Sequence, residues 1–224
     1  EVFGRALERL AQQDPSVVAI TAAMASGTGL SLFSRLFPDR FYDVGICEEH
    51  AVIFAAGLAC EGLRPVVAMY STFSQRVVDY VIHDVCLQNL PVVLCLDRAG
   101  VVGDDGPTHH GTFDIALFRA VPNLVILQPG NETELGHMLY TALRRGRPAI
   151  IRYPRGAGPG APLAETFEEL PEGRAMVVRE GADVVLWGLG DFLGLARETA
   201  DLLRAEGLDV GVVNPRYIKP LDRD

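Results

Sequence analysis

Residues 41–71 read FYDVGICEEHAVIFAAGLACEGLRPVVAMYS, and this stretch decides the fold. A β-branched and aromatic run at 41–47 precedes an almost wholly apolar segment, Ala51–Cys60, and a second apolar run follows at 65–71. The middle segment is apolar around the whole circumference of a helix, which predicts a central, buried helix. Two apolar strands joined by a helix predict a parallel β-α-β unit.

The same alternation continues on both sides of this unit. We predict strands at 17–24, 41–47, 65–71, 91–97, 124–128 and 148–153, and helices at 30–37, 49–62, 74–88, 113–120 and 132–145. Nearly continuous apolar strands separated by helices are typical of a parallel sheet that is covered on both faces. Residues 1–156 are therefore predicted to form one α/β domain.

The composition changes after this region. Residues 157–181 are rich in Gly, Pro and clustered Glu, which predicts a solvated linker. Beyond it, 183–187, 191–206 and 209–214 have the pattern of one further β-α-β unit. One such unit cannot bury its own core, so we interpret residues 182–224 as the truncated start of a second α/β domain. The chain is accordingly expected to be an internal piece of a longer polypeptide.

Composition excludes several classes of function. The chain has 29 acidic and 20 basic side chains, a net charge of −9, which argues against binding to nucleic acid or to an anionic membrane surface. Its longest apolar run is too short to span a bilayer. The cysteines (Cys47, Cys60, Cys86 and Cys95) show no CxxC spacing, and we expect buried, reduced thiols in a cytoplasmic protein, with no metal ligands in this chain.

Charged and aromatic side chains follow several of the predicted strands. Glu48 follows the second strand, residues 70–76 the third, Asp97 and Arg98 the fourth, and residues 152–155 the sixth. In open α/β sheets, ligands bind outside the carboxyl ends of the strands. The sequence therefore predicts an anion-binding active site at this edge.

Residues 99–111, AGVVGDDGPTHHG, contain four glycines, two acids and two histidines. A long irregular segment inside a compact domain is usually functional, although a solvated turn with incidental histidines is the alternative. Two other residues also have ordinary structural explanations. Glu48 would favour the positive end of a helix, and Arg98 could pair with Asp97.

Five blocks of the sequence carry a resemblance to a known family. They are DVGICEEHAV at 43–52, YSTFSQR at 70–76, DRAGVVGDDGPTH at 97–109, RYPRG at 152–156 and YIKPLD at 217–222. In order and spacing they resemble the 1-deoxy-D-xylulose-5-phosphate synthases, which are transketolase-like thiamine diphosphate enzymes. The Glu-x-His-Ala block also fits transketolases and pyruvate dehydrogenase beta subunits, whereas the loop at 97–109 is more specific.

The resemblance implies a pyrimidine-binding fold and a transferase that condenses pyruvate with glyceraldehyde 3-phosphate and releases carbon dioxide. Its product would serve isoprenoid, thiamine and pyridoxal biosynthesis. The cofactors implied are thiamine diphosphate and magnesium, with the metal ligands in an N-terminal diphosphate-binding domain that this sequence lacks. The resemblance also implies a homodimer, and it implies that this fragment is inert without the N-terminal domain.

Functional residues are implied by the same resemblance. Glu48 matches the glutamate that hydrogen-bonds the aminopyrimidine ring of the cofactor, a contact that favours the imino tautomer. Phe73 matches the aromatic residue that stacks on this ring, and Arg76 lies beside it. His109 matches a histidine that handles protons on the substrate oxygens. The positions that would hold glyceraldehyde 3-phosphate are Tyr70, Arg98, Asp105 and Arg155.

Two alternatives stay open at this point. One is another member of the transketolase superfamily, such as a beta-type subunit of a 2-oxo acid dehydrogenase, which would transfer its product to lipoamide. The other is a partner-binding or scaffold chain that keeps the fold without the cofactor. Retention of Glu48, Phe73 and Arg98 together argues against a scaffold.

Overall fold

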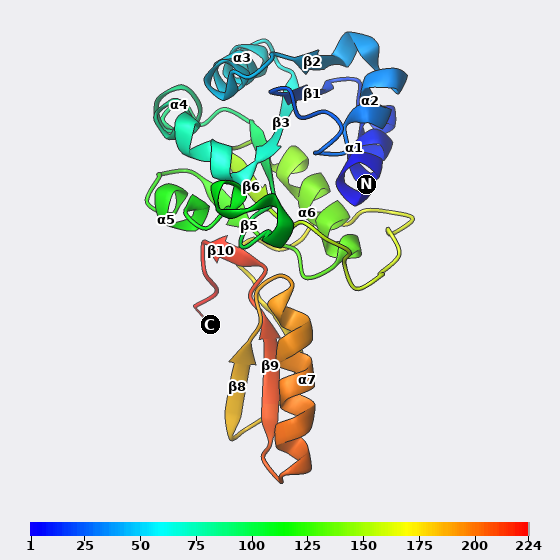
Figure 1. The fold of residues 1–224 in the computed structure, drawn as a ribbon, viewed down its shortest axis with the longest axis vertical. Coiled ribbons are helices and arrows are strands. Elements are labelled where there is room, and N and C mark those ends of the chain that lie inside the picture. Colours follow the sequence, from blue (N-terminus) through cyan, green and yellow to red (C-terminus); the bar gives the residue numbers. More distant parts are fainter. Residues whose placement is uncertain (224) are drawn as a thin grey trace.

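The computed structural model describes residues 1–223, which form a large α/β unit with a smaller β-sheet and helix below it (Figure 1). The larger sheet has seven strands in the order β10-β5-β6-β4-β3-β1-β2. Its strands are β1 (Val17–Thr21), β2 (Phe41–Asp43), β3 (Arg64–Tyr70), β4 (Val93–Asp97), β5 (Val125–Leu127), β6 (Ala149–Arg152) and β10 (Tyr217–Lys219). Every pairing in this sheet is parallel except that of β10 with β5. The predicted α/β fold is confirmed.

Helices cover both faces of the larger sheet (Figure 1). They are α1 (Val2–Gln13), α2 (Ser31–Leu36), α3 (Glu48–Cys60), α4 (Val78–Tyr80), α5 (Asp114–Phe118) and α6 (Glu132–Arg145). The core against α1, α2 and α6 includes Val66 and Ala68 of β3, while the core against α3, α4 and α5 includes Val67 and Met69. Successive residues of one strand therefore enter opposite cores, as the pleat of a strand requires. Short 3₁₀ helices occupy Pro38–Arg40, Ser71–Val77, Gly103–Asp105 and Pro107–His109, and Val81–Cys86 forms a π-helix.

Sequence explains where α6 begins and ends. The side chain of Asn131 accepts a hydrogen bond from the Glu134 backbone N–H at 2.8 Å, which caps the first turn. Gly146 ends the helix in the left-handed region with φ of 62°. Acidic residues occupy the first turn and arginines the last, in the arrangement that the helix dipole favours.

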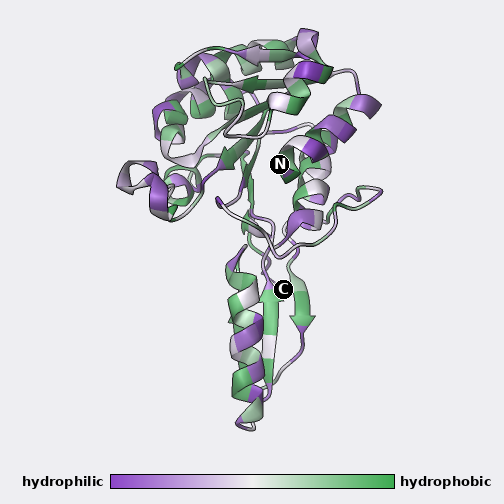
Figure 2. Ribbon diagram, turned by 45° about the vertical axis from the view of Figure 1, so that its right-hand side comes forward, coloured by the Kyte–Doolittle hydropathy of each residue, from purple (hydrophilic) through white to green (hydrophobic). Residues whose placement is uncertain are grey.

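The smaller sheet contains β7 (Met176–Arg179), β9 (Val210–Asn214) and β8 (Val184–Trp187), in that order. One helix, α7 (Phe192–Ala205), packs on it through Leu193 and Ala200. In Figure 2 the strands of both sheets are coloured mainly hydrophobic, while α7 mixes hydrophilic and hydrophobic residues.

The observed elements differ from the predicted division of the chain in three places. An N-terminal helix, α1, was not among the predicted elements. Strand β7 lies within the range expected to be a linker, because it pairs with β9 of the smaller sheet. Strand β10 returns to the larger sheet and pairs with β5, although residues 182–224 were expected to belong to the second domain alone.

Buried polar contacts join the two parts of the chain. Glu134 of α6 is 5% exposed, and its carboxylate accepts hydrogen bonds from Asn214 Nδ2 at 2.9 Å and from Arg216 Nε at 2.6 Å. The backbone N–H of Gly130 donates to the same carboxylate at 2.8 Å. A buried carboxylate with this many donors fixes the chain between β9 and β10 against α6.

Two expectations about burial need correction. Helix α3 is buried through Ala51, Val52 and the alanines that follow. Ile53, on another face of the helix, is 44% exposed, so the helix is not covered on every side. Cys47 and Cys60 are exposed, whereas Cys86 and Cys95 are buried as expected. Among residues 1–223, no helix combines the length and apolarity that crossing a membrane requires.

Candidate active site

Glu48 lies at the first turn of α3, just beyond the carboxyl end of β2. Its side chain is almost completely buried and receives an ion-pair contact from Arg76 Nη1, 3.3 Å from Glu48 Oε1. No side chain caps the start of this helix, so the Glu48 carboxylate does not accept a hydrogen bond as its N-cap. The neighbouring Glu49 is half-buried rather than buried. Glu48 is thus held inside the protein with only one cationic partner among the described contacts.

Arg76 links this carboxylate to a cluster of three aromatic rings. The Arg76 guanidinium is 4.9 Å from the centroid of the Phe73 ring, and Phe73 stacks on Tyr70 with centroids 5.8 Å apart. The imidazole of His109 meets the edge of Phe73 at 5.6 Å. A half-buried aromatic surface is therefore connected to Glu48 through Arg76, and such a surface suits a planar heterocycle.

Arg98 follows β4 in a left-handed backbone conformation, with φ of 62°. This region is costly for residues other than Gly and is often used at functional sites. Its guanidinium lies 3.7 Å from the centroid of the Tyr70 ring and donates to the carbonyl oxygen of Gly27 at 3.2 Å. It also contacts Asp97 Oδ1 at 3.2 Å, so the anticipated pairing with Asp97 exists. These contacts orient the guanidinium rather than leaving it free on the surface.

Asp105 bridges two arginines. Arg98 Nε is 3.0 Å from Asp105 Oδ2, and Arg155 Nη1 is 2.5 Å from Asp105 Oδ1. Two guanidinium groups directed at one anion form the arrangement that binds phosphate or carboxylate groups well. The structure thus connects all the predicted site residues, from Glu48 to Arg155, through a continuous series of contacts.

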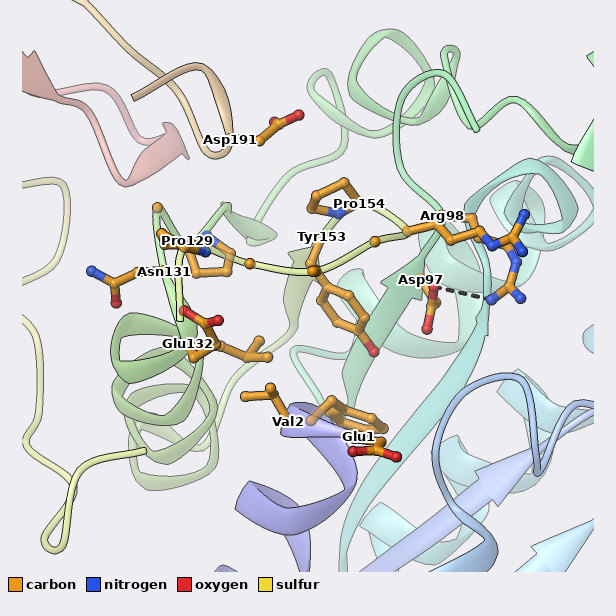
Figure 3. Close-up of a pocket in the computed structure, with 18 of the residues that line it drawn as sticks. Glu1, Val2, Asp97, Arg98, Pro129, Asn131, Glu132, Tyr153, Pro154 and Asp191 are labelled. Carbon is orange, nitrogen blue, oxygen red and sulfur yellow. Dashed lines mark hydrogen bonds and ion pairs between the residues drawn. The ribbon is translucent and has the colours of Figure 1, made fainter. Parts of the chain in front are cut away.

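A cavity adjoins one end of this series. Its volume is about 500 Å³, and Arg98 and Arg155 line it together with Asp97, Tyr153 and Gly27. Figure 3 shows the side chains of Asp97 and Arg98 on one side of the cavity and the helix that carries Glu132 on the other. Glu48, Phe73 and Arg76 do not line it. Arg98, which lines the cavity and packs on Tyr70, therefore connects the cavity to the aromatic rings.

Sequence reasoning did not single out several residues of this region. The hydroxyl groups of Tyr153 and Ser71 are buried and have no hydrogen-bond partner in the structure. Arg152, which the sequence placed at the site edge, is instead buried in an ion pair with Asp114, its Nε lying 2.8 Å from Asp114 Oδ2. For Asp97, the only sequence signal was its position at the carboxyl end of a predicted strand, which does not show how buried the side chain is.

Burial raises the pKa of Asp97 from 3.8 to about 6, although the neighbouring Arg98 opposes the shift. The folded chain thus holds this proton more tightly than the unfolded chain does. The free energy of unfolding consequently falls as the pH rises from about 4 to about 6. Above about pH 6 it stays lower by the amount lost over this range, which is the cost of burying the ionised carboxylate.

Asp97→Asn should remove this cost. At pH 7 we expect the variant to be more stable than the native chain by up to about 3 kcal/mol, and at pH 4 the difference should nearly vanish. Urea unfolding at both pH values measures this. Asp104→Asn, at an exposed position of the same region, is the matched control and should show no such change. Equal stability of the native chain and the Asp97 variant at both pH values would contradict the prediction.

Comparison with protein families gives two matches. The family model described as "Transketolase, pyrimidine binding domain" matches residues 1–160. The model described as "Transketolase, C-terminal domain" matches residues 173–224.

Curated proteins named 1-deoxy-D-xylulose-5-phosphate synthase match the whole sequence. The protein from Symbiobacterium thermophilum is 58% identical over 224 residues, which are 100% of this chain and 34% of that protein. The protein from Carboxydothermus hydrogenoformans is 57% identical over 222 residues, 99% of this chain and 36% of that protein. The chain thus spans about a third of the length of these relatives.

A solved structure has the same arrangement of elements. It is described as "Split gene transketolase, inactive beta4 tetramer", and it superimposes with a TM-score of 0.84 at 30% sequence identity. The match covers 99% of this chain and 72% of that one.

Proposed function

This chain belongs to the transketolase family, and from that premise we propose that it forms the pyrimidine-binding part of a 1-deoxy-D-xylulose-5-phosphate synthase. The complete enzyme would condense pyruvate with glyceraldehyde 3-phosphate, release carbon dioxide and supply isoprenoid, thiamine and pyridoxal biosynthesis. The observation that carries the proposal is the series of contacts from Glu48 to Arg155. It places a buried carboxylate and an aromatic surface at one end and an arginine pair at the other.

The residues beside Glu48 suit the pyrimidine ring of thiamine diphosphate. A buried carboxylate in this position would accept a hydrogen bond from a ring nitrogen, and Phe73 offers a half-buried face on which the ring would stack. Arg76 would hold the Glu48 carboxylate in place through their ion pair. When bound, thiamine diphosphate would supply the nucleophilic carbon and the electron sink that decarboxylation of a 2-oxo acid requires.

The arginine pair, at the other end of the series of contacts, would bind the substrate. Arg98 and Arg155 would bind the phosphate of glyceraldehyde 3-phosphate, because they already lie on either side of the Asp105 carboxylate. Tyr70 supports Arg98 by stacking under its guanidinium. His109, beside Tyr70 and Phe73, would exchange protons with the substrate oxygens.

Further parts of the proposal concern the complete protein. We place the magnesium ligands and the diphosphate site in a separate N-terminal domain, as the resemblance implies and as the greater length of the relatives allows. The similar split-gene transketolase is described as an inactive tetramer, which supports the proposal that the present chain is inert alone. We further propose a cytoplasmic homodimer.

Pyruvate consumption by the complete enzyme tests the proposal. With thiamine diphosphate and magnesium present, we expect turnover that requires glyceraldehyde 3-phosphate, and none from residues 1–224 alone. Turnover that requires lipoamide instead would support a beta-type subunit of a 2-oxo acid dehydrogenase. Absence of turnover with either acceptor would contradict both enzymatic functions and favour a scaffold.

A further inference from the structure

The segment that contains Asp105 and His109 is closed at its base by a backbone bridge. Gly100 and Gly111 exchange two N–H···O hydrogen bonds, each 2.8 Å long. A Cβ atom at Gly111 would lie 2.5 Å from the carbonyl oxygen of Arg98, so only glycine fits there. We call residues 101–110, which this bridge closes, the lobe.

A side chain makes a second connection inside the lobe. The backbone N–H of Val102 donates a hydrogen bond to Nδ1 of His110, at 3.1 Å. Because the donor is an amide, Nδ1 must be the unprotonated nitrogen, and the proton of the neutral ring is on Nε2. Val102 is 7% exposed, so this bond pairs an amide of a buried residue that would otherwise lack a protein partner.

The bond spans the lobe that presents the proposed site residues. Asp105 lies between Val102 and His110 in sequence and contacts both arginines, while His109 immediately precedes His110. Thr72 Oγ1 donates a hydrogen bond to the Thr108 carbonyl at 3.1 Å. The Asp105 carboxylate also accepts hydrogen bonds from Arg98 Nε and Arg155 Nη1, so three described hydrogen bonds tie the lobe to the sheet edge. The bonds of Thr108 and Arg155 are exposed to solvent, whereas the internal His110 bond is partly buried.

We propose that His110 is a positioning residue, which holds Asp105 and His109 in place through the hydrogen bond from the Val102 amide to its Nδ1. The roles of Asp105 and His109 in this inference rest on the proposed function. His110 itself acts through the shape of the lobe and not by contact with the substrate.

Two substitutions separate the hydrogen bond from the size of the side chain. His110→Asn places an oxygen acceptor near the position of Nδ1, whereas His110→Leu fills similar space without an acceptor. In the complete enzyme, amide hydrogen exchange should show Val102 roughly tenfold less protected in the leucine variant, the effect of losing one hydrogen bond. The asparagine variant should retain native protection, and so should Val101→Ala, a control at an exposed lobe position.

Steady-state kinetics provides the second measurement. We expect His110→Leu to raise KM for glyceraldehyde 3-phosphate by about tenfold and leave KM for pyruvate unchanged, with His110→Asn close to the native enzyme. The ¹⁵N spectrum of the native enzyme should show His110 as the Nε2–H tautomer. This measurement needs no variant, so an Nδ1–H tautomer would overturn the inference even if the leucine variant fails to fold.

Three results would overturn the inference. They are an Nδ1–H tautomer of His110, native protection of Val102 in the leucine variant, and equal kinetic defects in the leucine and asparagine variants. Hydrogen exchange and the tautomer do not depend on catalysis. If the native enzyme showed no turnover, the proposed function would fail while these measurements still tested the positioning role.

Discussion

Replacing Glu48 with Gln is expected to lower thiamine-diphosphate-dependent turnover of the complete enzyme by about 10²- to 10⁴-fold, the usual contribution of a positioned acid–base group. Gln keeps the shape of the side chain but removes the charge that accepts a proton or a strong hydrogen bond. The Glu48 side chain is only 4% exposed, so water cannot easily substitute for the lost carboxylate.

The fold should tolerate this substitution. The side chain of Arg76, the ion-pair partner of Glu48, is 46% exposed, so solvent can hydrate its guanidinium when the carboxylate is removed. Melting temperature and circular dichroism should therefore change little while turnover falls. Glu49→Gln, at the adjacent half-buried position, is the matched control and should remain within about twofold of native turnover. Native turnover in the Glu48 variant would refute the proposed role.

Replacing either Arg98 or Arg155 with Ala is expected to raise KM for glyceraldehyde 3-phosphate by about 10- to 100-fold, because each loses a charge-assisted hydrogen bond to phosphate. Arg98 should have the larger effect. Its side chain is 14% exposed and held by Tyr70, Asp97 and Gly27, whereas that of Arg155 is 43% exposed. A preoriented and partly desolvated guanidinium loses less entropy when it binds an anion.

An unphosphorylated acceptor separates phosphate binding from a general disturbance of the site. With D-glyceraldehyde, the native enzyme and both variants should have similar kcat/KM, since there is no phosphate to bind. Arg197→Ala, on the exposed surface of α7, should leave both acceptors unaffected. If the Arg98 and Arg155 variants lose equal activity toward both acceptors, the arginines do not serve as the phosphate site.

The conformation of Asp105 bears on these kinetics. Its carboxylate lies between the guanidinium groups that we assign to the substrate phosphate. A phosphate dianion carries more charge than a carboxylate and offers more acceptor oxygens, so it would compete well for the same donors.

The sequence by itself determined the parallel strands of the larger sheet, because hydrophobic periodicity is a local property of the chain. Runs such as 65–71 and 91–97 have too few polar residues for a half-exposed strand, and they form β3 and β4 at the centre of the sheet. The segments predicted as helices contribute α3 and α6 at nearly the expected bounds. Strands β7 and β10 were missed as sheet members, since a short strand gains its stability from a partner that is distant in sequence.

For the site, the sequence supplied the residue types and the edge of the sheet where they gather. Only the tertiary structure decided how they meet: Glu48 and Arg76 are 28 positions apart, Asp105 and Arg155 are 50, and Arg98 and the Gly27 carbonyl are 71. It also decided the environment of Asp97 and the hydrogen bond of His110. Burial and hydrogen-bond partners are set by side chains from several strands and loops, whereas the periodicity that a sequence displays describes one element at a time.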